Sequence, residues 1–468
     1  MLTYSFEEKG KDSLYQYLYK QIKNDILSFQ LAPGEKLPSK RALAKHLNIS
    51  TITVENAYSQ LVAEGYLYSV PKSGYYVCDL SLNSRKKENT LPSFLPKQNE
   101  DTSYFADFVN NSTAQDNFPF SIWTKLMRET LSDDANKLMV RSPSAGVFEL
   151  RSAIAHYLYQ FQGLSVEPEQ IIIGAGTEYL YGLIIQLLGR NQIYAVEEPG
   201  YQKISKIYRA NDVSCVHISL DENGIDVNQL EKSNAQVLHI SPSHHFPTGF
   251  VTPVSRRYEL LSWASKSPNR FIIEDDYDSE FRLIGKPIPS LSSIDVLDKV
   301  IYINTFSKSL SSTIRISYMV LPKSLIPAYQ KELSFYSCTV SNFEQYTLAK
   351  FIERGFLEKH INRMRNFYRS QRDIILSSIK KEKNYKKTRI REENAGLHFL
   401  LEVKTKLSDE ELIQKAAENG IHISCLSQYF YDKSKAKEHT LIVNYSGIET
   451  SNIPEAIHRL FQSLWDSK

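Results

Sequence analysis

The sequence has few cysteines, little net charge and no long hydrophobic run. Its four cysteines lie far apart and form no CxxC motif, so neither a disulfide scaffold nor a metal site is predicted. The formal net charge of +3 is too small to indicate nucleic-acid binding by itself. No run of about 18 apolar residues is present and the N-terminus lacks the regions of a signal peptide, which predicts a cytoplasmic protein with no membrane partner.

The chain instead contains three zones of different composition. Its 468 residues are too many for one ordinary hydrophobic core. Residues 80–103 are polar, charged and proline-bearing, as in a linker. Beyond them, apolar runs such as QIIIGAG and RFIIEDDY alternate with segments of helical length, which predicts a mostly parallel sheet covered by helices. We therefore predict an α/β protein with an N-terminal module at 1–79, a linker at 80–103 and a large domain at 104–468.

The N-terminal module has the pattern of three helices followed by a hairpin. Apolar residues repeat at helical spacing over 14–28, Ser39 is placed to cap a second helix, and a third helix is predicted over 51–64. The segment YLYSVPKSGYYV is then typical of a hairpin with Lys72 at its tip. Two short helices joined by a tight turn and followed by such a wing predict DNA binding in the major groove. A small three-helix bundle that makes protein contacts is the alternative.

The large domain carries four motifs that together indicate pyridoxal 5′-phosphate (PLP). DDY places Asp275 and Tyr277 at the end of a buried strand, and NTFSK places Lys308 after another apolar run. GAGTE is a glycine-rich turn before a helix, where backbone N–H groups favour a phosphate. In this interpretation Lys308 is the Schiff-base lysine, Asp275 keeps the pyridine nitrogen protonated and Tyr277 bonds the ring hydroxyl. The remaining predicted contacts are Ala175, Gly176, Thr177, Thr305, Ser307 and Arg315 to the phosphate, and Tyr201 of EEPGY stacked on the ring.

The N-terminal module resembles the winged helix-turn-helix of the GntR regulators. The matching residues are Leu37, Pro38, Ser39, Arg41, Leu43, Ala44, Leu47, Ser50, Thr53, Val54, Ala57, Tyr58, Leu61, Gly65, Tyr66 and Gly74. The resemblance implies that double-stranded promoter DNA is contacted at its phosphates by Ser39, Lys40 and Arg41 and in its groove by Thr51, Thr53 and Asn56, with Lys72 on the wing. The family often has an arginine where this chain has Thr51, so the base preference stays open.

Residues 105–465 resemble the fold-type-I aminotransferases, on the joint match of GAGTE, EEPGY, PTG, DDY and SK with Arg315. Together with the GntR module, the whole chain resembles the MocR/GabR regulators, and SPSHHFPTG, EDDYDSEFR and ERGFLEKHINRMRNFY agree with that family. The resemblance implies a PLP-binding regulator whose large domain has the aminotransferase fold with a smaller C-terminal α+β subdomain. It also implies a head-to-tail homodimer that senses a small amine, an amino acid or PLP itself.

One residue departs from a working aminotransferase. These enzymes usually bind the substrate carboxylate through an arginine near the end of the chain, where LIVNYSGI has Ile442. Loss of that bidentate pair predicts a sensor rather than a productive enzyme. Lys203 stands where the GabR type has an effector-binding arginine, and Gln428 is a further candidate for the effector site. Two alternatives remain: an active aminotransferase with an N-terminal adaptor, and a DNA-binding protein whose large domain is only a dimerisation scaffold.

Overall fold

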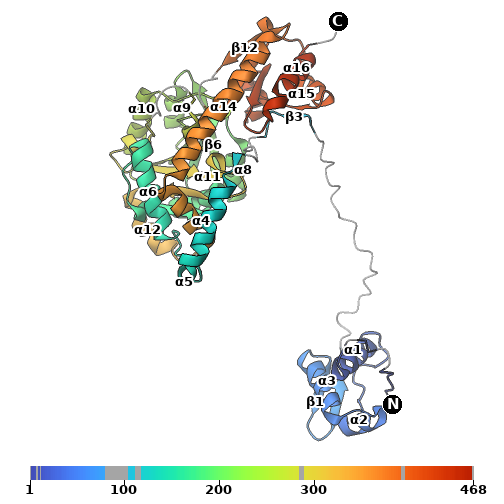
Figure 1. Ribbon diagram of the computed structural model, residues 1–468. Helices are drawn as coiled ribbons and strands as arrows, with labels where there is room; N and C mark the ends of the chain where they lie inside the picture. Colours follow the sequence, from blue (N-terminus) through green and yellow to red (C-terminus); the bar gives the residue numbers. More distant parts are fainter. Residues whose placement is uncertain are drawn as a thin grey trace. The chain divides into compact units, whose positions relative to one another are not determined.

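The chain divides into two compact units, Met1–Asp101 and Thr102–Lys468, which are described separately (Figure 1). The structure is a computed structural model. It describes residues 2–6, 9–10, 12–79, 104–110, 117–283, 289–391 and 396–465. The predicted linker at 80–103 lies outside the described residues.

The first unit contains three helices and a hairpin, as predicted. The elements are α1 (Leu14–Leu27), α2 (Lys40–Leu47), α3 (Thr51–Ala63), β1 (Leu67–Val70) and β2 (Gly74–Val77), with β1 and β2 antiparallel. Ser39 caps α2 by accepting a hydrogen bond from the Ala42 N–H at 3.2 Å, and Ser50 caps α3 in the same way. Asn48 ends α2 in the left-handed region at φ 53°, which turns the chain toward α3.

The core of this unit is made from one face of each helix and of the hairpin. Leu18 and Ile22 of α1, Val54 and Leu61 of α3 and Leu67 of β1 are almost fully buried in one cluster. Truncating one of these leucines to alanine removes about 2–5 kcal/mol of stability in typical cores. The helix-turn-helix therefore keeps its geometry through packing, which leaves the polar faces of α2 and α3 available.

An eight-stranded mixed sheet forms the centre of the second unit, in the order β4-β11-β10-β9-β8-β5-β6-β7. The strands are β4 (Ile171–Gly174), β5 (Ile193–Glu198), β6 (Ser214–Asp221), β7 (Gly224–Ile225), β8 (Val237–Ile240), β9 (Phe271–Asp275), β10 (Val300–Thr305) and β11 (Ser317–Val320). Adjacent strands from β10 to β6 are parallel, whereas β11 is antiparallel to both neighbours and β7 is antiparallel to β6. The prediction of a mostly parallel sheet is confirmed.

Helices cover both faces of this sheet. Ile171 and Ile173 of β4 pack into one hydrophobic cluster with α6 and α13, whereas Ile172 packs into another with α7. This alternation is the period-two pattern of a strand buried on both faces. The helices are α4 (Phe120–Asp133), α5 (Ala135–Leu138), α6 (Phe148–Gln162), α7 (Thr177–Leu188), α8 (Gln202–Ala210), α9 (Val227–Lys232), α10 (Val254–Ser265), α11 (Phe306–Ser309), α12 (Ile326–Glu332) and α13 (Asn342–Glu353). Within the described residues, no helix combines the length and the apolar character needed to cross a bilayer.

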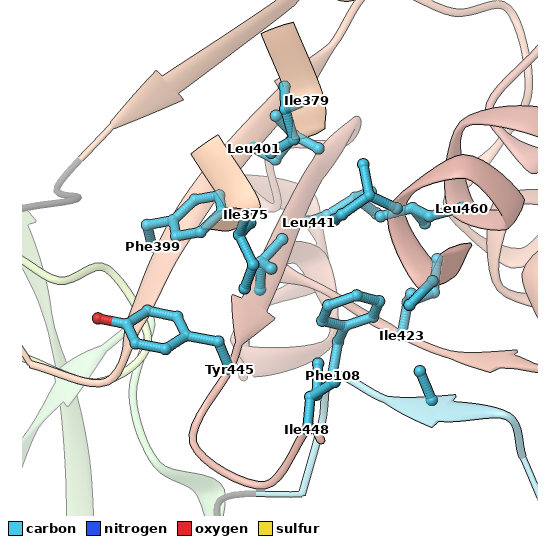
Figure 2. Packing of buried hydrophobic residues seen from close by; sticks show 14 of the residues in the cluster. Phe108, Ile375, Ile379, Phe399, Leu401, Ile423, Leu441, Tyr445, Ile448 and Leu460 are labelled. Atoms are coloured by element: carbon cyan, nitrogen blue, oxygen red, sulfur yellow. The ribbon is translucent and has the colours of Figure 1, made fainter. Parts of the chain in front are cut away.

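A smaller α+β part follows the long helix α14, which is drawn in orange in Figure 1. The helix α14 spans Phe356–Lys381, and the elements after it are β12 (Thr388–Arg391), β13 (His398–Val403), α15 (Asp409–Glu418), β14 (Ile421–His422), β15 (Ser424–Cys425), β16 (Thr440–Asn444) and α16 (Ile453–Ser463). The sheet order is β12-β13-β16-β15, and β14 pairs with β3 (Ala106–Asp107). Figure 2 shows Ile375 and Ile379 of α14 packed with Leu401 of β13 and Leu441 of β16. This core ties the C-terminal part to α14, confirming the predicted subdomain.

Candidate cofactor cavity and DNA-binding surface

A cavity of about 730 Å³ lies at the carboxyl-terminal edge of the large sheet. β9 ends at Asp275, which lies beside Ile303 of the parallel strand β10. Two residues later β10 ends at Thr305, and Ser317 of β11 lies opposite both Thr305 and Gly174. Three segments that are distant in the sequence therefore meet at one edge, which is where open α/β sheets bind ligands.

The cavity brings together nine of the ten residues predicted to hold the cofactor. They are Gly176, Thr177, Tyr201, Asp275, Tyr277, Thr305, Ser307, Lys308 and Arg315. The tenth, Ala175, lies outside the lining, and its backbone N–H donates to the Thr339 hydroxyl at 2.9 Å. Neither Lys203 nor Gln428, the two predicted effector residues, belongs to the lining.

One end of the cavity has the groups that a phosphate needs. Gly176 has φ +94°, and a Cβ there would lie 2.7 Å from Arg315 Nη2, so only glycine allows the guanidinium to cover the turn. Thr177 then begins α7, whose first N–H groups carry a partial positive charge. Ser307 and Thr305 add hydroxyls, with the Ser307 N–H donating to Thr305 Oγ1 at 3.1 Å. These donors fit a phosphate group.

Lys308 has an amine that is easier to deprotonate than an ordinary lysine. Burial lowers the pKa of Lys308 to about 8, and nearby Asp278 acts in the opposite direction. A larger fraction of the amine is therefore neutral near pH 7, which is the form that attacks an aldehyde. The cavity environment thus prepares this lysine as a nucleophile.

Asp275 has one oxygen that is bonded and one that is not. Tyr181 donates its hydroxyl to Asp275 Oδ2 at 2.5 Å, and His239 Nε2 lies 3.6 Å from the same oxygen. The Tyr208 hydroxyl lies 2.6 Å from the other ring nitrogen of His239 and fixes that ring. Among the described residues, none forms a hydrogen bond with the buried Asp275 Oδ1. A buried carboxylate oxygen without a partner is costly, so this atom fits a protonated ring nitrogen of a ligand.

The two predicted effector residues are engaged elsewhere. Lys203 forms an ion pair with Glu178 Oε1, and Arg315 Nη2 lies 3.8 Å from Glu178 Oε2. Glu178 thus lies between a predicted effector residue and a predicted phosphate residue. The Gln428 side chain accepts a hydrogen bond from the Cys425 N–H at 3.0 Å. Their roles as effector ligands stay predictions.

Sequence reasoning missed several cavity residues, above all Tyr181, His239, Glu197 and His245. Glu197 is buried, accepts a hydrogen bond from the Ser241 N–H at 2.9 Å and lies 3.5 Å from His245 Nε2. Burial raises the pKa of Glu197 to about 8 and lowers that of His245 to about 3. Its position in the sequence could have indicated Glu197, because this residue lies near the end of an apolar strand, as Asp275 does.

In the first unit, most residues predicted to contact DNA lie on the surface. Exposed are Ser39, Arg41, Thr51, Asn56 and Lys72. Lys40 differs, because it forms an ion pair with Glu55 at 2.6 Å. The Thr53 hydroxyl lies 2.8 Å from Ser50 Oγ and so takes part in capping α3. Both side chains are therefore engaged within the protein, and their contacts with DNA stay predictions.

Ile52 was missed as a surface residue of α3. Its side chain is 68% exposed in the first turn of the helix, between Thr51 and Thr53. An isoleucine this exposed has no role in the core and is able to contact a thymine methyl group in a major groove. The sequence pattern suggested only a helical position for it.

Fold and site together define a class: a winged helix-turn-helix joined to an aminotransferase-like domain with a PLP-fitting cavity. "Bacterial regulatory proteins, gntR family" matches residues 14–77, and "Aminotransferase class I and II" matches residues 109–460. The HTH-type transcriptional regulator YdeL of Bacillus subtilis is 41% identical over 96% of both chains. The probable rhizopine catabolism regulatory protein MocR of Rhizobium meliloti is 28% identical over 96% of this chain and 93% of its own.

The chain belongs to the MocR/GabR subfamily of GntR transcriptional regulators. A kynurenine aminotransferase from Pyrococcus horikoshii has the same fold in its large unit, with a TM-score of 0.68, 23% identity, and 77% of this chain and 91% of the other covered. PLP is the cofactor that the aminotransferase-like domain accommodates. The predictions of family, fold class, cofactor and regulatory role are confirmed.

Proposed function

We propose that the large domain holds PLP on Lys308, senses a small amine, an amino acid or PLP itself, and thereby controls how the GntR module binds promoter DNA. The functional domains are residues 1–79 and 104–468, joined by 80–103. The observation that carries the proposal is the buried Asp275 oxygen without a partner among the described residues, in the same cavity as Lys308 with its lowered pKa, in a GntR regulator. A domain kept only as a dimerisation scaffold has no need for this costly arrangement.

Each cavity residue has a separate task in holding the cofactor. Bound PLP supplies an aldehyde that joins to amines and a ring that withdraws electrons. Gly176, Thr177 and Ser307 would donate hydrogen bonds to its phosphate, and Arg315 would add a charge-assisted pair. Asp275 Oδ1 would accept a hydrogen bond from the protonated ring nitrogen, while Tyr181 holds the other carboxylate oxygen in place. Tyr277 would donate a hydrogen bond to the ring hydroxyl, and Tyr201 would stack on the ring.

We infer that amino-acid turnover is absent or slow. The position of the usual carboxylate-binding arginine is taken by Ile442 in β16, a buried residue paired with Leu400 and Ser424 across the small sheet. An aliphatic side chain gives a substrate carboxylate no bidentate partner, so its Cα–H bond is not held toward Lys308. Steady production of keto acid from common L-amino acids would contradict this inference.

We also propose a head-to-tail homodimer. Met139 and Val140 are 79% and 65% exposed, and Phe335 on a neighbouring segment is 67% exposed. Arg141 connects the two segments by donating to Ser337 Oγ at 2.8 Å. Exposed apolar side chains gathered in this way are typical of interfaces. Sedimentation at micromolar protein tests the proposal, and a monomer at that concentration would contradict it.

One experiment tests the regulatory proposal as a whole. Purified protein is loaded with PLP, reduced with borohydride and digested, and the modified lysine is identified by mass spectrometry. In parallel, DNA sites selected from a random pool are titrated with protein with and without PLP. We expect modification at Lys308 and a DNA affinity or footprint that depends on PLP. Modification elsewhere, or DNA binding that ignores both PLP and amines, would overturn the proposal.

A further inference from the structure

A buried histidine–aspartate pair lies next to Tyr277 and is part of neither the predicted PLP-holding set nor the cavity lining. His244 follows β8 and Asp278 follows β9, and these strands are parallel neighbours, so their carboxyl-terminal ends bring together residues 34 positions apart. His244 Nδ1 lies 2.8 Å from Asp278 Oδ2 and 3.0 Å from Asp278 Oδ1. Both side chains are almost fully buried. The motifs SPSHHFPTG and EDDYDSEFR thus supply two buried polar groups that the proposed function does not use.

Asp278 determines which nitrogen of His244 carries hydrogen. A carboxylate accepts hydrogen bonds and donates none, so the nitrogen that faces it must donate. His244 Nδ1 therefore carries hydrogen whether the imidazole is neutral or protonated. Among the described residues, His244 Nε2 is buried and has no hydrogen-bond partner. The contact with Asp278 thus sets the tautomer of the ring.

The C-terminal part of the chain holds the His244 ring in place. Gly396 has φ +65°, and a Cβ at this position would overlap the His244 ring, so only glycine allows the backbone to pack there. The Tyr445 hydroxyl donates to the Gly396 carbonyl at 2.9 Å and thereby fixes the turn. The His398 ring lies 4.7 Å from that of His244, and burial lowers the pKa of His398 well below its ordinary value, so it brings no positive charge. The His244 ring cannot turn away from Asp278 without moving this backbone.

The same nitrogen of His244 contacts Tyr277, at 3.2 Å from the hydroxyl oxygen. Because Nδ1 is a donor, the Tyr277 oxygen accepts in this contact, and the hydroxyl hydrogen is left for another acceptor. Burial raises the pKa of Tyr277 well above its ordinary value, with Asp278 acting in the same direction, so the hydroxyl keeps that hydrogen. Tyr277 also lines the cavity. Its hydrogen is therefore available to an acceptor inside the cavity rather than to His244.

We propose that Asp278 and His244 are positioning residues: Asp278 keeps hydrogen on His244 Nδ1, and His244 turns the Tyr277 hydroxyl toward the ring oxygen of the cofactor. This inference rests on the proposed function, because the acceptor is the ring hydroxyl oxygen of bound PLP. A donor at that oxygen favours the deprotonated form of the bound cofactor. The pair therefore lowers the pH at which the cofactor changes its protonation state, and so sets the fraction of each form that meets an incoming amine.

Other titratable groups around the pair act on the same equilibrium through their charge, not through the direction of a hydroxyl. They are Asp275, Asp276, Glu197, His245, His398 and Lys308. Removal of a negative charge by itself favours the deprotonated cofactor and lowers the midpoint of its pH titration. Loss of the oriented hydroxyl raises that midpoint. Because the two effects have opposite signs, one variant can distinguish them.

The deciding variant is Asp278→Asn in PLP-loaded full-length protein, with the cofactor absorbance recorded against pH. With an asparagine amide, hydrogen is no longer held on His244 Nδ1, and this nitrogen can accept from the Tyr277 hydroxyl, which then points away from the cofactor. We expect the midpoint to rise by about 1–2 pH units in Tyr277→Phe, as the loss of a hydrogen bond to an ionised group does. In Asp278→Asn it should rise by a smaller amount, because the lost charge acts in the opposite direction.

Two variants of His244 form a matched pair. His244→Asn retains a side-chain N–H donor near the position of Nδ1, so it should keep the wild-type midpoint. His244→Leu leaves Asp278 without that donor, so the carboxylate competes for the Tyr277 hydrogen and the midpoint should rise. If Asp278→Asn does not fold, these two variants decide the question by the same readout.

Asp276→Asn is the control for a lost acid, because Asp276 contacts Gln162 and Tyr302 instead of His244, and it should not raise the midpoint. A midpoint that falls or stays unchanged in Asp278→Asn, or an equal rise in Asp276→Asn, would overturn the positioning role. So would equal midpoints in the two His244 variants. These results would leave the proposed function intact, since PLP would still be bound. Wild-type protein that shows no PLP absorbance would overturn both.

Discussion

The DNA-binding surface and the PLP cavity place their polar residues in opposite environments. On the first unit, Arg41, Asn56 and Lys72 stand in solvent and the core beneath them is purely apolar. In the second unit, Asp275 and Glu197 are buried among tyrosines and histidines. The charge state of an exposed residue is little affected by the protein around it, whereas the charge state of a buried residue is set by its surroundings before any ligand binds. Substitutions on the DNA-binding surface should therefore change DNA affinity by small amounts, whereas substitutions in the cavity should change PLP binding by large ones.

The largest expected effect is that of Lys308→Ala. Without the amine, PLP has no covalent attachment point, so borohydride reduction should fix no cofactor to the protein. The measurement is the intact mass after reduction and removal of free PLP. Lys323→Ala, an exposed lysine outside the cavity, is the matched control and should retain full modification. If the variant without Lys308 is still modified, PLP is attached at another lysine and the assignment of Lys308 is wrong.

Asp275→Asn should weaken PLP binding by about 10- to 100-fold, because it replaces a charge-assisted bond to the ring nitrogen with a neutral contact. The change is isosteric, and the asparagine side-chain oxygen can still accept the hydrogen bond that the Tyr181 hydroxyl donates. Tyr181→Phe should have a smaller effect, since it removes only the bond that orients the carboxylate. Equilibrium dialysis with PLP measures both. Equal affinities in wild type and Asp275→Asn would show that the unpaired oxygen does not face the cofactor.

Burial of Glu197 predicts a pH-dependent stability of the second unit. Because burial raises the pKa of Glu197 in the folded protein to about 8 from its ordinary value of 4.5, the folded state retains a proton that the unfolded state has lost. This group's contribution to stability is fully present below about pH 4.5 and is lost as the pH rises to about 8. Glu197→Gln, which mimics the protonated acid, should therefore gain stability relative to wild type across this interval.

Tryptophan fluorescence isolates that effect, because Trp123, Trp263 and Trp465 all lie in the second unit. Urea unfolding midpoints at pH 5 and pH 8 provide the comparison. A wild-type and variant difference that does not change with pH would mean that Glu197 is ionised in the folded protein.

The smallest effects are expected on the DNA surface. Arg41→Ala should weaken binding across DNA sequences and reduce the slope of log affinity against log salt by about 1, as loss of one phosphate contact does. Asn56→Ala should instead change the preferred bases. Ile52→Ala should cost discrimination mainly at sites with thymine, through loss of a methyl contact. Binding to a selected site and to point variants of it separates these cases, and a uniform loss for all three would contradict the division.

The sequence predicted the parts of the molecule that depend on short segments. The cap at Ser39, and the PLP-holding motifs, are local patterns whose chemistry is visible within a few residues. The Tyr181–Asp275 hydrogen bond joins residues that are 94 positions apart. Predicting it requires knowing that the end of β9 lies next to α7 in the folded protein. The meeting of Arg209, His217 and Tyr431 in the cavity wall was hidden for the same reason, because α8, β6 and the segment around Tyr431 come together only after the sheet forms. Nor could spacing reveal that Glu178 engages Lys203.

The most direct test of the account joins both regions in one measurement. PLP-loaded full-length protein is bound to a DNA site selected from a random pool, and its affinity is measured as amines are added, with the cofactor absorbance recorded in the same samples. We predict that one amine changes absorbance and DNA affinity together, and that Lys308→Ala abolishes both responses while still binding DNA. Rapid keto-acid production with no change in DNA affinity would contradict the account and identify the large domain as an enzyme.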